Sequence, residues 1–525
     1  MSEQKTGMKR REFLVAGTAG IVALTAFGTG SAQAQVAGGE VIVVQGSNPP
    51  SLDAMATSSG ASRNITMNVY ETLYGFDEKV NPMPILAQGV DISADGLTYN
   101  FKLRQGVKFH NGDEMKASDV KASMERYRKV GATANLLDPV DSFEVVNDHE
   151  IIFHMKAKTP TFLEAFSSPR APAVVIPEED AAAEAGKTSL VGTGPYKITD
   201  YVPDSHVTLE KFADYTQDTR YDGPDGFGGK KTAYFDKATF RVMPEPGAQV
   251  AALEAGEVDI VETMPVPAAR RLANSPDIAV QQNLQWAFGT FILNMNAPPT
   301  DNPKFREAIQ VALNMEEVMG IASEGLFGLN GGWAYPDSPY DVGDIGAVDY
   351  YNKADIPRAQ ALLKEAGYTN APFSLLTDNS IPFHGKAAVV IAEQLKAAGI
   401  NVVINQVDWP TALNVRLQDT GWNGWTLTMG IEPYLGPVAI TATLTGKRPH
   451  FVKNDPELEA LYKELISGET PEIRKATFAK IQKRLYEFFG IVKLGDTGQM
   501  QGLRANIENF KMFRFPRVYD IWRKS

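Results

Sequence analysis

Residues 374–407, SLLTDNSIPFHGKAAVVIAEQLKAAGINVVINQV, contain three consecutive elements of regular structure. Residues 374–377 form a short apolar run that predicts a buried strand. Residues 386–398 are rich in helix formers, and Gly399 directly after them predicts the end of a helix. The β-branched residues of 400–407 predict a second strand. A strand, a helix and a strand in this order predict a parallel pair with a crossover helix, and therefore a mixed α/β fold.

The same mixture of strands and helices extends along the rest of the chain. Runs of β-branched or alternating residues predict strands at 40–45 (EVIVVQ), 97–103 (LTYNFKL), 150–155 (EIIFHM) and 258–261 (VDIV). Helical patterns that begin at proline or end at glycine predict helices at 248–255, 303–321, 357–367 and 471–489. Asp301 or Asn302 is the expected N-cap of the helix at 303–321.

The composition excludes several classes of protein. The chain has 525 residues, a length typical of more than one domain, and 43% of them are hydrophobic. Lys and Arg number 51 against 63 Asp and Glu, a formal net charge of −12, whereas a protein that wraps nucleic acid needs a strongly basic surface. The absence of cysteine excludes disulfides, thiolate metal sites and cysteine nucleophiles. A large, acidic, globular protein that does not bind nucleic acid remains.

The first 34 residues have the pattern of an export signal. Residues 9–11 (KRR) precede a soft apolar stretch at 13–27, and residues 32–34 (AQA) follow as a cleavage motif. Paired arginines before a modestly hydrophobic stretch indicate the twin-arginine route, with cleavage after Ala34. The stretch is too short for a transmembrane helix, which needs about 20 apolar residues. We expect residues 1–34 to be removed as a twin-arginine signal peptide, leaving a soluble chain.

Motifs for catalysis or metal binding are missing from the sequence. It contains no G-x-S-x-G or H-E-x-x-H, and its six histidines never have the spacing of metal ligands. Residues 181–188 (AAAEAGKT) fit the loose spelling of a phosphate-binding loop, but the acidic, alanine-rich run at 178–185 favours a helix that ends at Gly186. Amides bonded inside a helix cannot bind phosphate. We therefore predict no catalytic residues, no metal site and no cofactor.

Seven short blocks occur in a characteristic order. They are 70–73 (YETL), 103–112 (LRQGVKFHNG), 117–120 (ASDV), 192–196 (GTGPY), 253–259 (LEAGEVD), 305–309 (FREAI) and 362–368 (LLKEAGY). Their order and spacing resemble the signature of family 5 extracellular solute-binding proteins, which are the dipeptide-, oligopeptide- and nickel-binding components of bacterial ABC importers. We interpret Tyr70, Leu73 and Phe109 within the blocks as core residues.

The resemblance implies a two-lobed periplasmic binding protein with a hinged cleft and an extra inserted domain. The implied boundaries are 35–60, 170–265 and 490–525 for the discontinuous domain I, 61–169 for the inserted domain II, and 266–489 for domain III. Such a protein captures a solute between its lobes, closes on it, and docks as a monomer on permease subunits in the inner membrane. No bond in the solute is broken, so the resemblance implies transport rather than catalysis.

The candidate ligand-binding residues follow partly from composition and partly from the resemblance. Five of the six tryptophans lie between positions 286 and 425, and large amphipathic rings suit a cleft that holds varied solutes, although core packing is the alternative for each. Ser47 and Asn48 follow the first strand, and Trp425 begins the segment that resembles the family's ligand-reading stretch. The candidates are Ser47, Asn48, Trp286, Trp409, Trp425, Met429, Glu432 and Tyr434.

This ligand-reading stretch departs from the pattern of the peptide binders. They have a Trp, then an Asp that holds the peptide's α-ammonium, then an acidic residue followed by Pro. In residues 425–434 (WTLTMGIEPY), Glu432 and Pro433 match the final pair, but the Asp position falls at Thr428 or Met429. A solute without a free ammonium is therefore expected, such as a modified peptide, an opine-like conjugate or an oligosaccharide, unless Glu432 replaces the Asp.

Two other functions remain open from the sequence. One is an exported enzyme such as a hydrolase, which the missing nucleophile motifs disfavour. The other is a ligand-binding sensor or chaperone on the same scaffold. Turnover of a ligand would indicate the enzyme, whereas neighbouring genes for permeases and ATPases would indicate transport.

Overall fold

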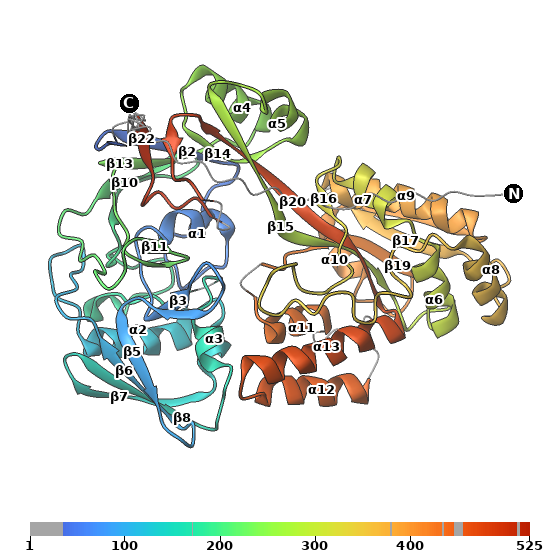
Figure 1. The fold of residues 1–525 in the computed structure, drawn as a ribbon, viewed down its shortest axis with the longest axis horizontal. Helices are drawn as coiled ribbons and strands as arrows, with labels where there is room; N and C mark the ends of the chain where they lie inside the picture. The colour runs from blue at the N-terminus through green and yellow to red at the C-terminus, as the bar shows by residue number, and fades with distance from the viewer. Residues whose placement is uncertain are drawn as a thin grey trace, which may run out of the picture.

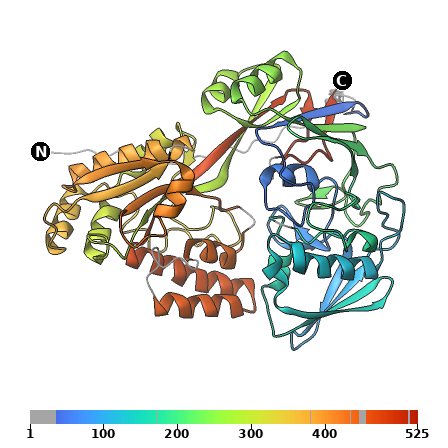
Figure 2. The same cartoon turned by 180° about the vertical axis from the view of Figure 1, so that it is seen from behind.

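The computed structural model places the chain in two lobes joined by two long strands (Figures 1 and 2). It describes residues 35–170, 172–378, 381–432, 435–445, 455–511 and 515–524. The predicted signal peptide, residues 1–34, lies outside the described residues, as do Pro433 and Tyr434. No helix in the described ranges combines the length and the apolar character that crossing a membrane requires.

One eleven-stranded sheet runs through both lobes. Its order is β18-β17-β19-β15-β20-β14-β2-β13-β10-β9, and β16 (Phe327–Gly328) pairs with β20 off this path. The other strands are β2 (Glu40–Gln45), β9 (Tyr196–Val202), β10 (His206–Lys211), β13 (Lys237–Val242), β14 (Ile260–Met264), β15 (Ile278–Leu293), β17 (Phe373–Asp378), β18 (Val402–Val407), β19 (Gly424–Met429) and β20 (Ile491–Arg504). Parallel and antiparallel pairs both occur, because β2 runs parallel to β13 and β14 while β15 runs antiparallel to β19 and β20.

Strands β15 and β20 are the connection between the lobes (Figure 1). Lobe 1 contains β2, β9, β10, β13 and β14, and lobe 2 contains β17, β18 and β19. The β15–β20 ladder is interrupted at residues 284–286, which face the single residue Gly498. This bulge lies between the part of β20 that pairs with β14 and the part of β15 that pairs with β19. It therefore lies where a hinge between the lobes must act.

A second, four-stranded antiparallel sheet completes lobe 1 (Figure 1). Its order is β5-β6-β8-β7, from β5 (Ala87–Ile92), β6 (Thr98–Leu103), β7 (Val140–Asn147) and β8 (Glu150–Met155). Helix α2 (Ala117–Val130) packs on β7 and β8, and α3 (Phe162–Phe166) follows in the chain. Burial alternates along β6 and β8, so one face of this sheet is core and the other is partly exposed. We call residues 87–170 the small-sheet region.

Most of the elements predicted from the sequence are present. The strands predicted at 40–45 and 150–155 are β2 and β8 with the same bounds. The predicted strand–helix–strand unit is β17, α9 (Pro382–Ala397) and β18, and its two strands are parallel. The predicted helices at 248–255, 357–367 and 471–489 are α4 (Pro246–Ala255), α8 (Ile356–Glu365) and α13 (Pro471–Phe488). Helices that the sequence did not predict are α1 (Gly60–Thr66), α5 (Val266–Leu272), α10 (Trp409–Val415), α11 (Pro437–Thr445) and α12 (Pro456–Ser467).

Two predicted helices are wrong. The helix expected over 303–321 is two helices, α6 (Pro303–Ala312) and α7 (Met315–Ala322), although Asn302 does cap the first. The chain breaks between them because the Asn314 side chain accepts from the amide of Glu317 at 3.1 Å and starts a new helix.

The helix expected over 178–185 is only a short 3-10 turn, Glu178–Asp180. Side chains occupy the backbone groups that a helix would need. Asp53 accepts from the Gly186 amide at 2.9 Å, and Arg126 donates to the carbonyls of Ala183 and Glu184. The Gly186 amide, which a phosphate-binding loop would offer to its ligand, already donates to the Asp53 carboxylate.

The sequence blocks of lobe 1 pack against one another. Tyr70, Leu73 and Phe109 are buried, as interpreted from the sequence. The Gly192 amide donates to His110 Nδ1 at 3.2 Å, and His110 Nε2 donates to the Gly194 carbonyl at 3.0 Å. Burial lowers the pKa of His110 to about 4, so the ring is neutral and can accept at Nδ1. The blocks therefore build the scaffold.

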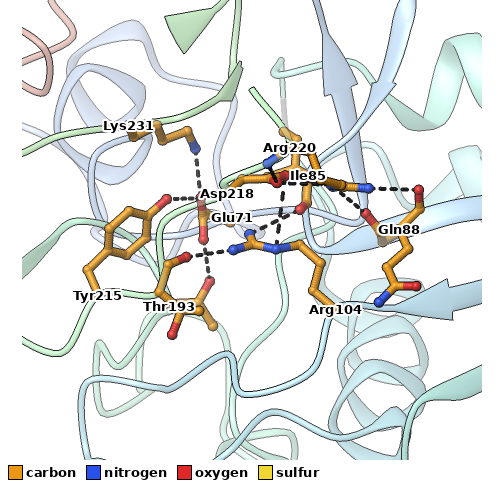
Figure 3. A network of polar contacts seen from close by, with 11 residues as sticks. Glu71, Ile85, Gln88, Arg104, Thr193, Tyr215, Asp218, Arg220 and Lys231 are labelled. Atoms are coloured by element: carbon orange, nitrogen blue, oxygen red, sulfur yellow. Dashed lines mark hydrogen bonds and ion pairs between the residues drawn. The ribbon is translucent and has the colours of Figure 1, made fainter. Parts of the chain in front are cut away.

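A buried carboxylate stands at the centre of this scaffold (Figure 3). Glu71 accepts from Lys231 Nζ at 2.8 Å, from the Tyr215 hydroxyl at 3.0 Å and from the Thr193 hydroxyl at 3.1 Å. Burial and the adjacent Glu71 raise the pKa of Tyr215 well above its usual value, which keeps its proton on the donor. Burial lowers the pKa of Lys231, but the Glu71 carboxylate outweighs this effect and the net pKa is raised.

A second ion pair lies beside Glu71 (Figure 3). Asp218 accepts from Arg220 Nη2 at 2.6 Å, and Arg104 Nε lies 4.0 Å from the same carboxylate. Arg104 also donates to the carbonyls of Ile85 and Thr216. These contacts fasten the edge of the small-sheet region to the loop at 215–229, so this cluster is structural.

Asp520 is expected to make the stability of the protein depend on pH. One of its carboxylate oxygens accepts from the Thr232 amide at 2.9 Å, while the other is buried without a hydrogen-bond partner among the described residues. Burial raises the pKa of Asp520 to about 7. The stabilising contribution of the protonated group is therefore full below pH ~4, the usual carboxyl pKa, and is lost as the pH rises through about 7.

Asp520→Asn should remove this loss. Between pH 5 and pH 8, the variant should lose about 2–3 kcal/mol less of its unfolding free energy than the wild-type protein does. Urea unfolding at both pH values measures the difference. Asp349→Asn, at an exposed carboxylate, is the matched control and should change nothing. Equal pH dependence of Asp520→Asn and the wild-type protein would contradict the assignment.

Candidate functional site

The two lobes are joined by a buried ion pair next to the hinge strands. Arg63, on α1 of lobe 1, donates to Glu432, three residues beyond β19 of lobe 2, at 2.8 Å. Both side chains are almost fully buried, 8% and 4% exposed, and the Arg63 guanidinium lies 5.0 Å from the centre of the Phe515 ring. A charge pair in such surroundings is strongly coupled, because burial weakens the screening of its two charges by water. The pair therefore favours contact between the lobes.

Helix α1 carries further polar groups beside Arg63. Asn64 donates to Gln45, the last residue of β2, at 3.4 Å. The Ser62 and Thr66 hydroxyls and the Asn64 side-chain carbonyl are buried and have no hydrogen-bond partner within the described part of the chain. Buried polar atoms normally find a partner in protein, water or ligand. Helix α1 thus places several polar side chains beside the end of strand β2.

Two of the predicted tryptophans meet on lobe 2. The rings of Trp409 and Trp425 lie 6.0 Å apart, and the His384 ring lies 6.1 Å from that of Trp409. Trp425 is completely buried, and its ring nitrogen has no acceptor within the described residues. Trp409, the first residue of α10, is half-buried. Trp425 therefore behaves as a core residue, and Trp409 is the member of the pair that small molecules can reach.

The other predicted ligand residues are spread around this region. Met429 ends β19 and is buried against the cluster that also contains Phe515 of lobe 1. Trp286 lies in the bulge of β15 and is half-buried. Ser47 is exposed, and Asn48 accepts from the Asp204 amide at 3.1 Å, so Asn48 holds a turn of lobe 1. Tyr434 lies outside the described residues.

Arg63 and Asn64 were missed by the sequence analysis. The stretch 60–66 (GASRNIT) has no apolar period and belongs to none of the blocks. Its partner Glu432 is 369 residues away, so no local pattern joins them. The only available signal was an arginine among small polar residues shortly after the first strand.

A cavity of about 390 Å³ lies between the small-sheet region and lobe 2. This volume is within the range of about 300–1,000 Å³ that is usual for small-molecule sites. Its lining is mostly apolar on both sides, with Phe76, Leu136, Pro139, Phe162 and Ala165 from lobe 1 and Leu435, Val438, Ala439, Ala442 and Tyr462 from lobe 2. The cavity therefore requires that the lobes be together.

One residue of the cavity lining, Glu164, belongs to a polar cluster that joins the two lobes. Glu164 of α3 accepts from the Tyr340 hydroxyl at 2.9 Å and from Arg474 Nη2 at 3.2 Å, and both partners belong to lobe 2. Burial raises the pKa of Glu164, while Arg474 and Tyr340 act in the opposite direction. Gly436 lies against the same carboxylate, because a Cβ at this position would come within 1.6 Å of Glu164. The sequence analysis proposed none of these residues.

One arrangement resembles part of a hydrolytic triad. Asp378 lies 2.6 Å from His384 Nδ1, and the Thr428 hydroxyl lies 3.2 Å from His384 Nε2. However, Nε2 already accepts from the Thr428 amide at 2.9 Å, which occupies the lone pair that a general base needs. Burial lowers the pKa of His384, with Asp378 opposing, so the neutral ring is a structural link between β17 and β19. Across the described residues, no three His, Asp or Glu side chains are placed to hold a metal ion.

The chain belongs to the bacterial extracellular solute-binding proteins, family 5. The model of this family, described as its middle part, matches residues 81–448. The family and the two-lobed α/β fold implied by the sequence blocks are thereby confirmed.

Relatives and solved structures extend this likeness over nearly the whole chain. A probable peptide ABC transporter periplasmic-binding protein of Sinorhizobium fredii is 26% identical, over 93% of this chain and 94% of that protein. The glutathione-binding protein GsiB of Pectobacterium atrosepticum is 27% identical, over 77% of this chain and 78% of that protein. The crystal structure of NikA from Brucella suis in complex with Fe(III)-EDTA has the same fold, with a TM-score of 0.80 at 21% identity over 93% of this chain and all of that one.

Proposed function

We propose that this chain is the periplasmic receptor of an ABC importer and captures a peptide-sized solute between its lobes. The observation that carries the proposal is that the Arg63–Glu432 pair and the 390 Å³ cavity are each built from both sides of the hinge. A solute that contacts both lobes binds the closed form better than the open form, and it therefore shifts the population toward closure. The permease then recognises the closed monomer.

The domain boundaries inferred from the resemblance are part of this proposal. The bulge at 284–286 lies inside the segment 266–489 assigned to domain III, close to its start, and β20 returns the chain to lobe 1 in the segment 490–525. The chain thus crosses between the lobes twice in adjacent strands, which suits a hinge rather than a sliding motion.

The proposal is tested by asking whether a solute makes the two lobes close while the solute itself stays chemically unchanged. Mature protein is screened against peptides, opines and oligosaccharides by thermal shift, because a ligand of the native state raises its stability with concentration. Small-angle scattering with each stabilising solute should show a smaller radius of gyration than without it. Mass spectrometry should recover the solute unchanged. Recovery of a chemically altered solute would support the exported-enzyme alternative instead.

Export by the twin-arginine route is proposed from the signal pattern at residues 1–34. The mature protein should begin at Gln35, which N-terminal sequencing of periplasmic protein determines. Changing Arg10 and Arg11 together to Lys should abolish export, because this route reads the arginine pair rather than the charge alone. Lys5→Arg in the same segment is the control and should leave export intact. Normal export of the double lysine variant would disprove this route.

A further inference from the structure

The cavity between the small-sheet region and lobe 2 is lined by one positive charge that has no negative partner among the described residues. Glu164 and Arg170 are the charged residues of its lining. Glu164 is bound by Arg474 and Tyr340, so its charge is compensated. Arg170 lies at the rim, and its guanidinium makes no hydrogen bond or ion pair with any described residue. The side chains of Asn135 and Thr161 also line the cavity without hydrogen bonds among the described residues.

We propose that this cavity binds the apolar part of an anionic amphipathic solute, with the anion at Arg170. The inference rests on the proposed function and specifies its cargo. An apolar body gains from leaving water for the carbon-lined interior. A carboxylate or sulfonate at the rim gains a charge-assisted hydrogen bond, which a guanidinium forms better than an ammonium does.

The position of the cavity links occupancy to closure. Phe162 and Leu136 belong to the small-sheet region, and Leu435 and Tyr462 belong to lobe 2. A solute that touches both sets loses its contacts with one of them when the lobes separate. Because Gly436 lies directly against Glu164, no side chain separates the two surfaces at this edge. Binding here therefore favours the same closed form that the receptor needs.

The proposal is tested with two fluorescent probes that share one aromatic body. 8-Anilinonaphthalene-1-sulfonate carries an anion, and N-phenyl-1-naphthylamine is the same molecule without it. Titration of folded mature protein should give a tighter dissociation constant for the sulfonate, by about tenfold, the scale of a charged hydrogen bond. Arg170→Gln should remove this preference and leave the affinity for the neutral probe unchanged, whereas Arg170→Lys should retain part of it.

Two further variants keep the test specific. Ala439 is half-buried in the cavity lining, so Ala439→Trp places a large ring in the cavity. This variant should lower the affinity for both probes at least tenfold. Arg241→Gln removes an exposed arginine of β13 far from the cavity and should change neither. Unchanged sulfonate affinity in Arg170→Gln, or unchanged affinity of both probes in Ala439→Trp, would overturn the proposal.

Failure of this inference and failure of the receptor function are distinguishable. If a solute compacts the protein and its affinity is unchanged in both Arg170→Gln and Ala439→Trp, the receptor function is supported and the cavity proposal is wrong. If the probes bind as described but no solute compacts the protein, the cavity proposal stands and the receptor mechanism is wrong.

Discussion

Lys231→Met should lower the free energy of unfolding by about 3–5 kcal/mol, the cost of leaving one member of a buried ion pair without its partner. Lys231 and Glu71 are both nearly inaccessible to water, and their charged atoms are 2.8 Å apart. The variant leaves the Glu71 carboxylate with two hydroxyl donors, Tyr215 and Thr193, and no positive charge within hydrogen-bond distance. Two neutral hydrogen bonds do not replace the solvation that an ionised carboxylate loses on burial.

The matched experiment is a double-mutant cycle in urea or guanidinium. Glu71→Gln alone should lower the free energy of unfolding by a similar amount, because it leaves the ammonium of Lys231 buried without its carboxylate. The double variant should be less destabilised than the sum of the two, by about 2 kcal/mol or more, since neither charge then remains. Glu393→Gln, which breaks an exposed pair with Lys396, should cost less than about 1 kcal/mol. Additive effects of the two buried substitutions would contradict strong coupling.

The pair at Glu71 also shows what the sequence could and could not reveal. The block containing Glu71 is a recognisable signature, and its apolar members were correctly interpreted as core. Its partner lies 160 residues later in a loop rich in glycine and aspartate. Strands and helices were predictable because their periods and end signals are local. Pairings between residues far apart in the sequence, such as Glu71 with Lys231, depend on the folded chain, which no local stretch of sequence contains.

The break between α6 and α7 is a different kind of miss, since its signal was present. Asn314 is followed three residues later by Glu317, a helix-start pattern inside an otherwise continuous helical run. The structure does not bring all of the predicted ligand residues together. Trp409 and Met429 pack in one apolar cluster and Glu432 pairs with Arg63, whereas Asn48 supports a turn and the cavity at Arg170 was not foreseen.

Unmodified dipeptides and tripeptides should bind this protein weakly, with dissociation constants above about 0.1 mM. A buried α-ammonium without a counter-charge carries a penalty of several kcal/mol, and each 1.4 kcal/mol is about tenfold in affinity. The peptide binders offset that penalty with an Asp for which this chain has Thr428 or Met429. Glu432 was the possible replacement, but its carboxylate faces Arg63 at 2.8 Å. Calorimetry with Ala-Phe and N-acetyl-Ala-Phe tests the point, and the blocked peptide should bind at least as well.

Arg63→Gln should reverse this preference. It removes the guanidinium beside Glu432 and leaves a buried carboxylate that an ammonium would stabilise, so the affinity for Ala-Phe should rise by about tenfold or more while that for N-acetyl-Ala-Phe should not. Arg63→Lys keeps the charge and should behave like the wild-type protein, and circular dichroism confirms that each variant is folded. In Arg63→Gln combined with Glu432→Gln, the gain should vanish, because the carboxylate that produces it is gone. Submicromolar binding of Ala-Phe to the wild-type protein, lost in Glu432→Gln alone, would instead mean that Glu432 leaves Arg63 to hold the ammonium, and that the cargo is an ordinary peptide.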